Sequence, residues 1–368
     1  MTPNPHLRSL HEAGVSIWLD TVSRQLLEDG DFAALIRDLS VTGATSNPTI
    51  FAKAITGSDR YDAQLRELVA GGERDTQKLF FALALDDVRA AAAALRQAHD
   101  ESAGRDGFIS FECTPDLADD TAATIAQAIE LWQRIGQPNA MIKVPGTPAG
   151  LPAIEELTRR GVNVNITLLF AIDRYEEVID AYLRGLTARA DAGEPIDQIA
   201  SVASFFLSRI DTKVDDQLPA DSPLRGSVAL ASARVAYQRY LEKFSGPDWQ
   251  RLQELGARSQ RPLWASTGTK NSAYSDVLYV EELIGPDVIN TMPEQTLQAF
   301  ADHGTVARTL DADPAAAAQT LQDAAAAGID LDDVTSGLER AGVASFCDSY
   351  HELLDCIEGK LGSLTAVG

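Results

Sequence analysis

One lysine lies near the end of a short apolar run, where its chemistry is unusual. Lys143 belongs to the segment Ala140-Met141-Ile142-Lys143-Val144-Pro145. Burying an unpaired ammonium group is costly, and one way to avoid that cost is to lose the proton. A neutral amine can attack a carbonyl carbon and form a Schiff base. The alternative is a lysine at a strand end whose ammonium group extends back to solvent.

Further side chains that could react with or bind a substrate stand at or near the ends of other β-rich runs. They are Asp20, Asn47, Glu112, Asn165, Thr167, Ser204, Phe206, Arg209, Ser266 and Lys270. If Lys143 attacks a ketone, loss of water from the carbinolamine needs a proton, which Glu112 could supply with a bound water and Thr167. Carbon–carbon cleavage of the resulting iminium needs a base on a substrate hydroxyl, and Asp20 is the candidate.

The iminium itself serves as the electron sink, so this chemistry predicts neither a metal nor a cofactor. None of the five histidines falls at the end of a β-rich run, and no metal-ligand cluster is expected.

Each of these residues also has an ordinary structural interpretation. Asp20 could cap the helix that follows it, and Asn47-Pro48 could be only a turn. Glu112 could pair structurally with Lys143, while Asn165 and Thr167 could merely share one face of a strand. Taken together these interpretations weaken, because several strands would point polar groups towards one place, and such groups are expensive to bury without a purpose.

The elements that must position these residues alternate along the chain. Apolar β-rich runs occur at 15–19, 43–45, 108–113, 140–144, 163–168, 201–206, 262–267 and 288–292. Helical periodicity lies between them, at 25–39, 78–98, 117–135, 149–160, 171–192 and 230–244. Eight strand–helix units predict an α/β protein of the (β/α)8 barrel type. An open doubly wound sheet is the second choice, because its glycine-rich first turn is missing.

The sequence from about residue 294 onwards predicts helices and shows no strand pattern. Helices are predicted at 314–327, 331–341 and 346–361, with Gly328, Asp330 and Gly342 as caps and turns between them. We therefore predict one barrel domain over residues 1–368, with a helical tail from about residue 294 packed on it.

Composition narrows the classes of partner. The net charge of −23 excludes nucleic acid, which would be repelled. Three cysteines suit a reducing cytoplasm better than a disulfide framework. We find neither a signal-peptide pattern nor an apolar run long enough to span a membrane, so no membrane partner is expected.

Several separated motifs resemble those of the transaldolases. They are Thr45-Ser46-Asn47-Pro48, Phe108-Ile109-Ser110-Phe111-Glu112, Ile142-Lys143-Val144-Pro145, Asn163-Val164-Asn165-Ile166-Thr167-Leu168 and Ser204-Phe205-Phe206-Leu207-Ser208-Arg209. The resemblance extends from about residue 15 to residue 354. Because the motifs occur in the family's order, the combination is far more specific than any single motif.

This resemblance implies a metal-free enzyme of the pentose phosphate pathway. It would move a dihydroxyacetone unit from sedoheptulose 7-phosphate to glyceraldehyde 3-phosphate, giving erythrose 4-phosphate and fructose 6-phosphate. Lys143 would form the Schiff base, Asp20 would be the acid and base, and Glu112 and Thr167 would hold the catalytic water. The resemblance also implies substrate-binding residues: Asn47, Asn165, Ser204 and Phe206 for the dihydroxyacetone unit, and Arg209 and Ser266 for the phosphate.

One departure concerns the phosphate. Family members commonly carry a second arginine just after the serine of the seventh strand, whereas this chain continues Ser266-Thr267-Gly268-Thr269-Lys270. Lys270 could supply that charge as a point cation, and a solvated loop lysine is the alternative.

Three other functions compete with this prediction. The first is an aldolase that releases dihydroxyacetone from fructose 6-phosphate, although that cousin is shorter and has a tyrosine near the position of Phe206. The second is a non-catalytic barrel that binds a sugar phosphate, and the third is a lysine enzyme that uses pyridoxal phosphate. The sequence leaves open whether the protein is a monomer or a homodimer.

Overall fold

Eight parallel strands close into a barrel in the computed structural model, which describes residues 3–366 and the side chains of residues 3–362. The strands follow one another around the barrel in chain order, and the last pairs with the first. Their bounds are β1 Val15–Leu19, β2 Gly43–Thr45, β3 Ile109–Glu112, β4 Ala140–Pro145, β5 Val164–Leu169, β6 Ser201–Phe206, β7 Arg261–Ala265 and β8 Val288–Met292. The predicted (β/α)8 barrel is confirmed.

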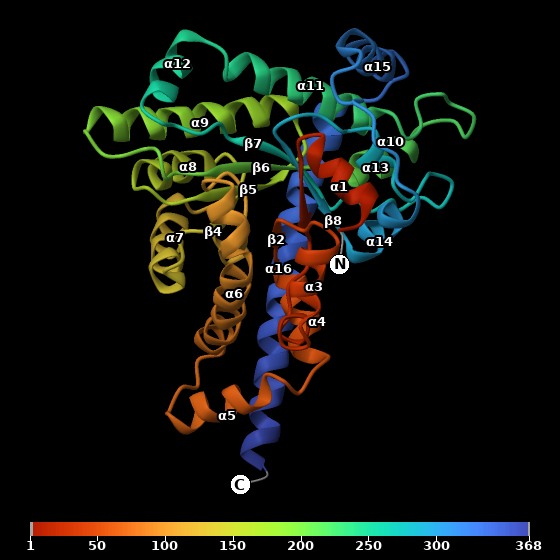
Figure 1. Cartoon of the computed structure of the whole chain (residues 1–368). Coiled ribbons are helices and arrows are strands. Elements are labelled where there is room, and N and C mark those ends of the chain that lie inside the picture. Colours follow the sequence, from red (N-terminus) through yellow and green to blue (C-terminus); the bar gives the residue numbers. More distant parts are fainter. Residues whose placement is uncertain (1–2, 367–368) are drawn as a thin grey trace.

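Helices surround this barrel and form its outer layer (Figure 1). They are α1 Pro5–Glu12, α2 Arg24–Glu28, α3 Asp31–Asp38, α4 Pro48–Thr56, α5 Asp62–Ala70, α6 Thr76–Glu101, α7 Thr121–Ile135, α8 Gly150–Arg159, α9 Ile172–Asp191, α10 Ser208–Asp215, α11 Val228–Lys243, α12 Pro247–Glu254, α13 Leu278–Glu281, α14 Glu294–His303, α15 Pro314–Ala326 and α16 Leu331–Ala366, with a 3₁₀ turn at Pro115–Leu117. The strands are buried almost throughout, as expected for a parallel sheet covered by helices on one face and filled by side chains on the other. Among the described residues, no helix is both long and apolar enough to cross a membrane.

Two predicted helices begin or break differently in the structure. The helix predicted at 25–39 is two helices, α2 and α3, because Gly30 between them takes a left-handed conformation with φ 81°. The helix predicted at 117–135 starts only at Thr121, where the Asp120 side chain accepts a hydrogen bond from the N–H of Ala123. The backbone conformation of Gly30 overrides the apolar periodicity in the first case, and the side-chain cap of Asp120 does so in the second.

The division of the tail at Gly342 is wrong, because α16 runs unbroken from Leu331 to Ala366. Gly342 is buried, and a Cβ atom placed there would lie 2.9 Å from Cδ2 of Leu168 and 3.7 Å from Nη1 of Arg209. The glycine therefore provides room for close packing of α16 against the barrel instead of ending the helix.

Replacing Gly342 by valine should lower the free energy of unfolding by about 1–3 kcal/mol, because the added methyl groups overpack against Leu168. The matched control is Gly337→Val on the same helix, where a Cβ has only Nη2 of Arg340 at 4.0 Å. Urea unfolding of both variants measures the difference. Equal stability of the two variants would show that close packing at Gly342 is unimportant.

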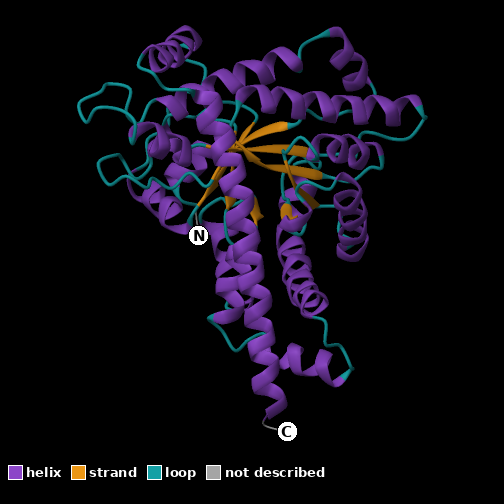
Figure 2. Cartoon of the chain, turned by 180° about the vertical axis from the view of Figure 1, so that it is seen from behind, coloured by secondary structure: helices purple, strands orange, loops and turns teal. Residues whose placement is uncertain are grey.

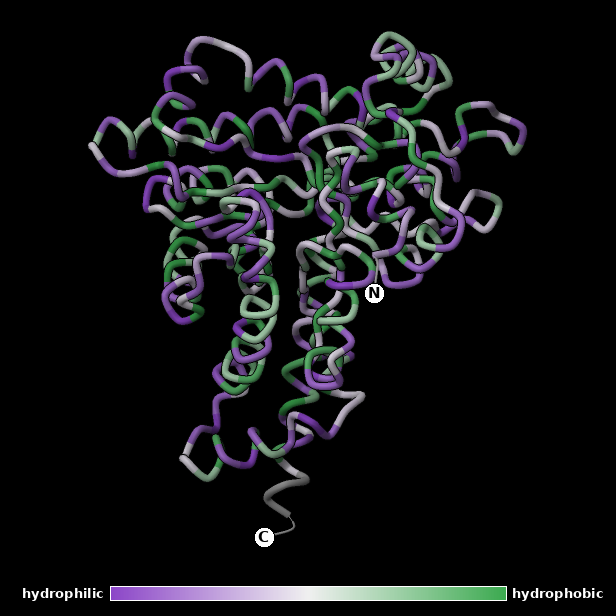
Figure 3. Tube along the Cα trace, viewed as in Figure 1, coloured by the Kyte–Doolittle hydropathy of each residue, from purple (hydrophilic) through white to green (hydrophobic). Residues whose placement is uncertain are grey.

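The long helix α16 connects several parts of the molecule. It packs against α4, α5, α6, α10 and β5. Seen from either side, α4, α5, α6 and the second half of α16 project beyond the barrel (Figures 1 and 2). Hydrophobic and hydrophilic positions are mixed along these helices, as expected where one face packs and the other meets solvent (Figure 3). The single domain over 1–368 stays a prediction, and its residues 1–2 and 367–368 lie outside the described part.

Candidate active site

Lys143 and Glu112 face each other across neighbouring strands near the carboxyl end of the barrel. The two residues are partners in the register of β3 and β4. Nζ of Lys143 lies 3.1 Å from Oε2 of Glu112 and donates a second hydrogen bond, of 3.2 Å, to the carbonyl oxygen of Ser46. Only 5% of Lys143 and 7% of Glu112 is exposed. The ammonium group therefore does not extend to solvent, which removes the alternative interpretation of Lys143.

Burial gives the Glu112 carboxyl an unusual affinity for protons. It raises the pKa of Glu112, while the charge of Lys143 and its hydrogen bond act in the opposite direction. Two such closely coupled groups titrate as a pair and not as independent sites. A carboxyl with a raised pKa at 3.1 Å can accept the proton that Lys143 must lose before it can attack a carbonyl.

A buried polar network continues from Lys143 into β5 and β6. Asn165 is the register partner of Lys143 and has no exposed surface. Its Nδ2 donates to Oγ of Ser110 at 2.9 Å, and Oγ of Ser204 donates to its Oδ1 at 2.7 Å. These two bonds fix the orientation of the amide, whose second N–H remains available.

Thr167 follows Asn165 two residues later, at an irregularity of the strand. The pairing register of β5 with β6 shifts between Ile166 and Leu169, and Leu168 has φ 60°. Thr167 is fully buried, and its Oγ1 has no hydrogen-bond partner in the described protein. A buried hydroxyl of this kind can bind a water molecule or a substrate group.

Asp20 stands directly after β1, and it does not cap the next helix. The cap of α2 is Ser23, whose side chain accepts a hydrogen bond from the N–H of Leu26. The Asp20 carboxylate instead accepts hydrogen bonds from Oγ of Ser266 at 3.3 Å and from Oγ1 of Thr21 at 3.4 Å. Burial raises the pKa of Asp20, opposed by those two hydrogen bonds and by the charge of Lys143.

Ser266 takes a left-handed conformation, with φ 51°, immediately after β7. Its N–H donates to Oγ1 of Thr291 at 3.0 Å, and its hydroxyl is engaged by Asp20. This position makes Ser266 a neighbour of Asp20, a relation that the sequence did not predict. Backbone strain of this kind is common where a side chain must be held in one place.

Arg209 and Lys270 are two neighbouring cations at the candidate site. In the described part of the chain, neither forms an ion pair within 4.0 Å. The guanidinium carbon of Arg209 lies 5.1 Å from the ring centre of Phe206, which stacks on Phe170. Burial lowers the pKa of Arg209, and partial burial together with Arg209 lowers the pKa of Lys270. Two unpaired cations in a strongly acidic protein form a suitable site for a phosphate dianion.

Asn47 has a structural role, while its predicted role in substrate binding stays a prediction. Its Oδ1 accepts a hydrogen bond of 2.9 Å from the N–H of Ile50 and so caps α4, while Pro48 occupies the first position of that helix. The side-chain amide N–H groups of Asn47 are not used by this cap.

Sequence reasoning missed three residues that organise the site. Ser46 supplies the carbonyl beside Lys143, Ser110 holds Asn165, and Phe170 stacks on Phe206 at 5.5 Å. A signal for Ser110 was available, because it lies two residues before Glu112 and therefore on the same face of β3.

Residues 17–357 match the family described as Transaldolase/Fructose-6-phosphate aldolase. The chain is 48% identical over 363 residues to a protein named Transaldolase from Parafrankia sp. (strain EAN1pec), covering 97% of this chain and 98% of that protein. A Transaldolase from Acidothermus cellulolyticus is 49% identical over 360 residues, with 96% of each chain covered. One from Mycolicibacterium smegmatis is 47% identical over 367 residues, with 98% of this chain and 99% of that protein covered. These matches confirm the predicted family, and the chain belongs to the transaldolase and fructose-6-phosphate aldolase family.

Proposed function

We propose that this protein is a transaldolase that transfers a dihydroxyacetone unit from sedoheptulose 7-phosphate to glyceraldehyde 3-phosphate through a Schiff base on Lys143. The function and the transferase class are supported by the family match and by relatives of that name across nearly the whole chain. The observation that carries the mechanism is the buried Lys143 amine, held 3.1 Å from the Glu112 carboxyl.

The first half of the proposed reaction forms the Schiff base. Nζ of Lys143 attacks the ketone carbon of the donor, and the resulting carbinolamine loses water to give an iminium. Glu112, with its raised pKa, delivers the proton to the leaving hydroxyl through a water held with Thr167. The Asn165 amide, fixed by Ser110 and Ser204, binds the hydroxyl groups of the dihydroxyacetone unit together with Asn47.

The second half breaks and remakes a carbon–carbon bond. Asp20 takes the proton from the hydroxyl on the fourth carbon, the bond between the third and fourth carbons breaks, and its electron pair moves into the iminium to form an enamine. The donor fragment leaves as an aldehyde. The enamine then adds to the acceptor aldehyde, Asp20 returns the proton, and water releases the product from Lys143.

The remaining assignments complete the proposal. Phe206 lines the site beside Arg209, and Arg209 and Lys270 bind the phosphate. Ser266 assists in phosphate binding, and its hydroxyl orients Asp20 by a hydrogen bond. We propose that the enzyme needs no cofactor, acts in the cytoplasm on sugar phosphates and not on nucleic acid or membranes, and is a monomer or a homodimer. Among the described residues, no cluster of three or more His, Cys, Asp or Glu side chains could hold a metal ion.

A direct test traps the Schiff base. Borohydride reduction in the presence of fructose 6-phosphate should leave a three-carbon adduct on the peptide that contains Lys143, as measured by mass spectrometry. A barrel that only binds sugar phosphates would remain unlabelled. A coupled assay with and without an acceptor aldehyde separates transfer from aldolase activity, because an aldolase would release dihydroxyacetone at full rate without the acceptor.

Glu112→Gln should slow Schiff-base formation by about 10²–10⁴-fold, because the amide cannot deliver a proton. Substrate binding should change much less, since Glu112 acts on the reacting atoms. Rapid-quench borohydride trapping measures the rate of adduct formation, and Glu130→Gln on the exposed face of α7 is the control. An unchanged trapping rate would refute the role given to Glu112.

Arg209→Gln should raise KM for fructose 6-phosphate by about 10–100-fold, because the variant loses a charge-assisted hydrogen bond to the phosphate, and a loss of this kind weakens binding by that factor. Lys270→Gln should have a smaller effect, because Lys270 is more exposed. For unphosphorylated fructose, kcat/KM should be nearly unchanged in both variants. Equal losses with both sugars would place these cations outside the phosphate site.

A further inference from the structure

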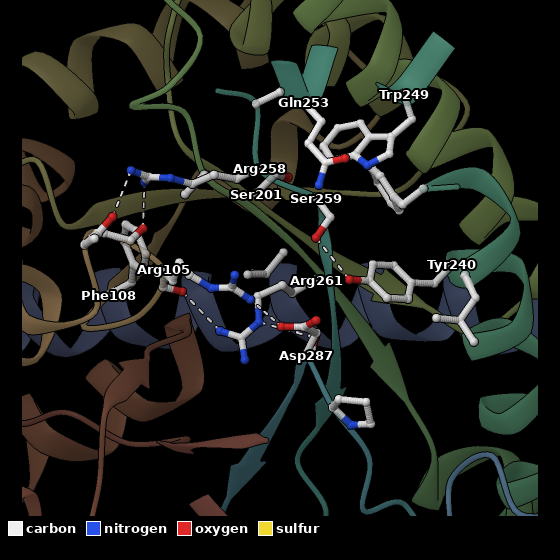
Figure 4. Close-up of a pocket in the computed structure, with 18 of the residues that line it drawn as sticks. Arg105, Phe108, Ser201, Tyr240, Trp249, Gln253, Arg258, Ser259, Arg261 and Asp287 are labelled. Carbon is white, nitrogen blue, oxygen red and sulfur yellow. Dashed lines mark hydrogen bonds and ion pairs between the residues drawn. The ribbon is translucent and has the colours of Figure 1, made fainter. Parts of the chain in front are cut away.

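A cavity of about 500 Å³ lies at the opposite end of the barrel from Lys143. Figure 4 shows residues that line it. Its walls include Phe108 just before β3, Ser201 at the start of β6, Arg261 at the start of β7 and Asp287 just before β8. Because the strands are parallel, these amino ends share one face of the barrel, whereas Asp20 and Ser266 follow the carboxyl ends. The volume falls within the range typical of small-molecule sites.

Positive charge exceeds negative charge in this cavity. Three arginines line it, Arg105, Arg258 and Arg261, against the single carboxylate of Asp287, which pairs with Arg105. Arg258 donates to the carbonyl oxygens of Gly104 at 2.7 Å and Ala103 at 3.0 Å. Neutral carbonyls hold the guanidinium in place without cancelling its charge.

Arg261 is held in the same way. It donates to the carbonyl oxygens of Val288 at 2.9 Å and Arg105 at 3.1 Å, and to Oγ of Ser16 at 2.8 Å. Within residues 3–366, neither Arg258 nor Arg261 forms an ion pair with a carboxylate. Burial lowers the pKa of both guanidinium groups, while Tyr182 and Asp197 act in the opposite direction on Arg258, and Asp106 and Asp287 on Arg261. A bound anion would offset the remaining cost of burying these charges.

The opposite wall of the cavity is aromatic. Tyr240 stacks on Tyr237 with ring centres 5.7 Å apart, and Phe244 meets Trp249 edge-on at 4.8 Å. The Tyr240 hydroxyl is hydrogen-bonded to Oγ of Ser259 at 3.0 Å, so its ring is fixed in orientation. Figure 4 shows Trp249 and Tyr240 on the side away from Arg105 and Arg258. Flat rings favour a flat apolar body as their partner.

We propose that this cavity is a second binding site, separate from the catalytic one, for a small organic anion that carries a flat ring. The arginines bind the anionic group, and the aromatic wall receives the ring. A role in stability alone, which is usual for this face of a barrel, explains the hydrogen bonds of Arg258 and Arg261 to the backbone. It does not explain an open, aromatic-lined cavity whose wall carries two guanidinium groups that, within residues 3–366, form no ion pair with a carboxylate.

The test is titration calorimetry of the full chain with adenosine 5′-monophosphate and with 1-naphthyl phosphate. With saturating fructose 6-phosphate present to occupy Arg209 and Lys270, we expect at least one of them to bind at a single site, more tightly than adenosine, 1-naphthol or inorganic phosphate alone, and more weakly as salt rises. A further increase in fructose 6-phosphate should leave this binding unchanged, because the two sites lie at opposite ends of the barrel. Failure of both probes at millimolar concentration, or displacement by fructose 6-phosphate, would overturn the proposal.

Variants locate the binding. Arg258→Gln should weaken binding of the anionic probe by about tenfold. Arg251→Gln should leave this binding unchanged, because Arg251 is an exposed arginine of α12 that pairs with Asp191 outside the cavity. Leu241→Trp partly fills the cavity from its rim and should also weaken binding. Leu241 is 40% exposed, so this variant tests the site even if Arg258→Gln fails to fold. Unchanged affinity in Leu241→Trp and in folded Arg258→Gln would place the ligand elsewhere.

Discussion

Replacing Lys143 by alanine should abolish the borohydride-trapped adduct and lower kcat for sugar transfer by on the order of 10⁴-fold or more. The reason is that Lys143 is the nucleophile of the proposed mechanism: it is buried in β4, where it meets Glu112 at the end of β3 and the carbonyl of Ser46. Coupled assays measure the loss of transfer, and mass spectrometry of the reduced protein measures the loss of the adduct.

Two controls separate loss of the nucleophile from loss of the fold or of the charge. Lys143→Arg keeps a cation beside Glu112 but cannot form the Schiff base, so it should be equally inactive. Lys270→Ala removes a lysine that follows β7 at the same end of the barrel and should still be labelled at Lys143. Because Lys143→Ala leaves a buried carboxyl whose pKa is already raised by burial, we expect Glu112 to take up a proton rather than unfold the protein. A labelled Lys143→Ala protein would contradict the mechanism.

The barrel itself was predictable from the sequence because its strands are short apolar runs separated by helices of regular period. Parallel strands covered on both faces need such runs, and their order in the chain fixes the order in the barrel. The break of α2 and α3 at Gly30 and the continuity of α16 through Gly342 were not predictable. A glycine can end a helix or give room for a neighbour, and only the position of Leu168 against Gly342 decides which.

The candidate site was predictable in its residue types and much less in its contacts. Lys143, Glu112 and Asn165 lie side by side because strand ends meet at one edge of the barrel. The hydrogen bond from Ser266 to Asp20 joins residues 246 apart in the chain, and no local pattern encodes it. The same is true of the closeness of Gly342 to Arg209, which brings the tail against the predicted phosphate site. Such relations depend on how separate elements pack.

Asp20→Asn should lower kcat by about 10²–10⁴-fold while leaving Schiff-base formation intact. This variant therefore tests whether Lys143 and Asp20 act in separate steps. Without a base on the substrate hydroxyl, the iminium forms but the carbon–carbon bond does not break. Borohydride with fructose 6-phosphate should therefore trap the uncleaved six-carbon sugar on Lys143, where the unmodified enzyme yields the three-carbon adduct. Asp31→Asn, at the exposed start of α3, is the control.

The pH profile adds an independent readout for Asp20. Burial raises the pKa of this carboxyl, and the proposed mechanism needs its base form, so kcat should rise as pH increases through a value above that of an ordinary aspartate. Only the ionised carboxylate can take the proton from the hydroxyl, and hence activity is lost on the acid side of that step. In Asp20→Asn this acid limb should disappear together with most of the activity. If the variant still yields the three-carbon adduct at the normal rate, the base in carbon–carbon cleavage must be another group, because an amide cannot accept that proton.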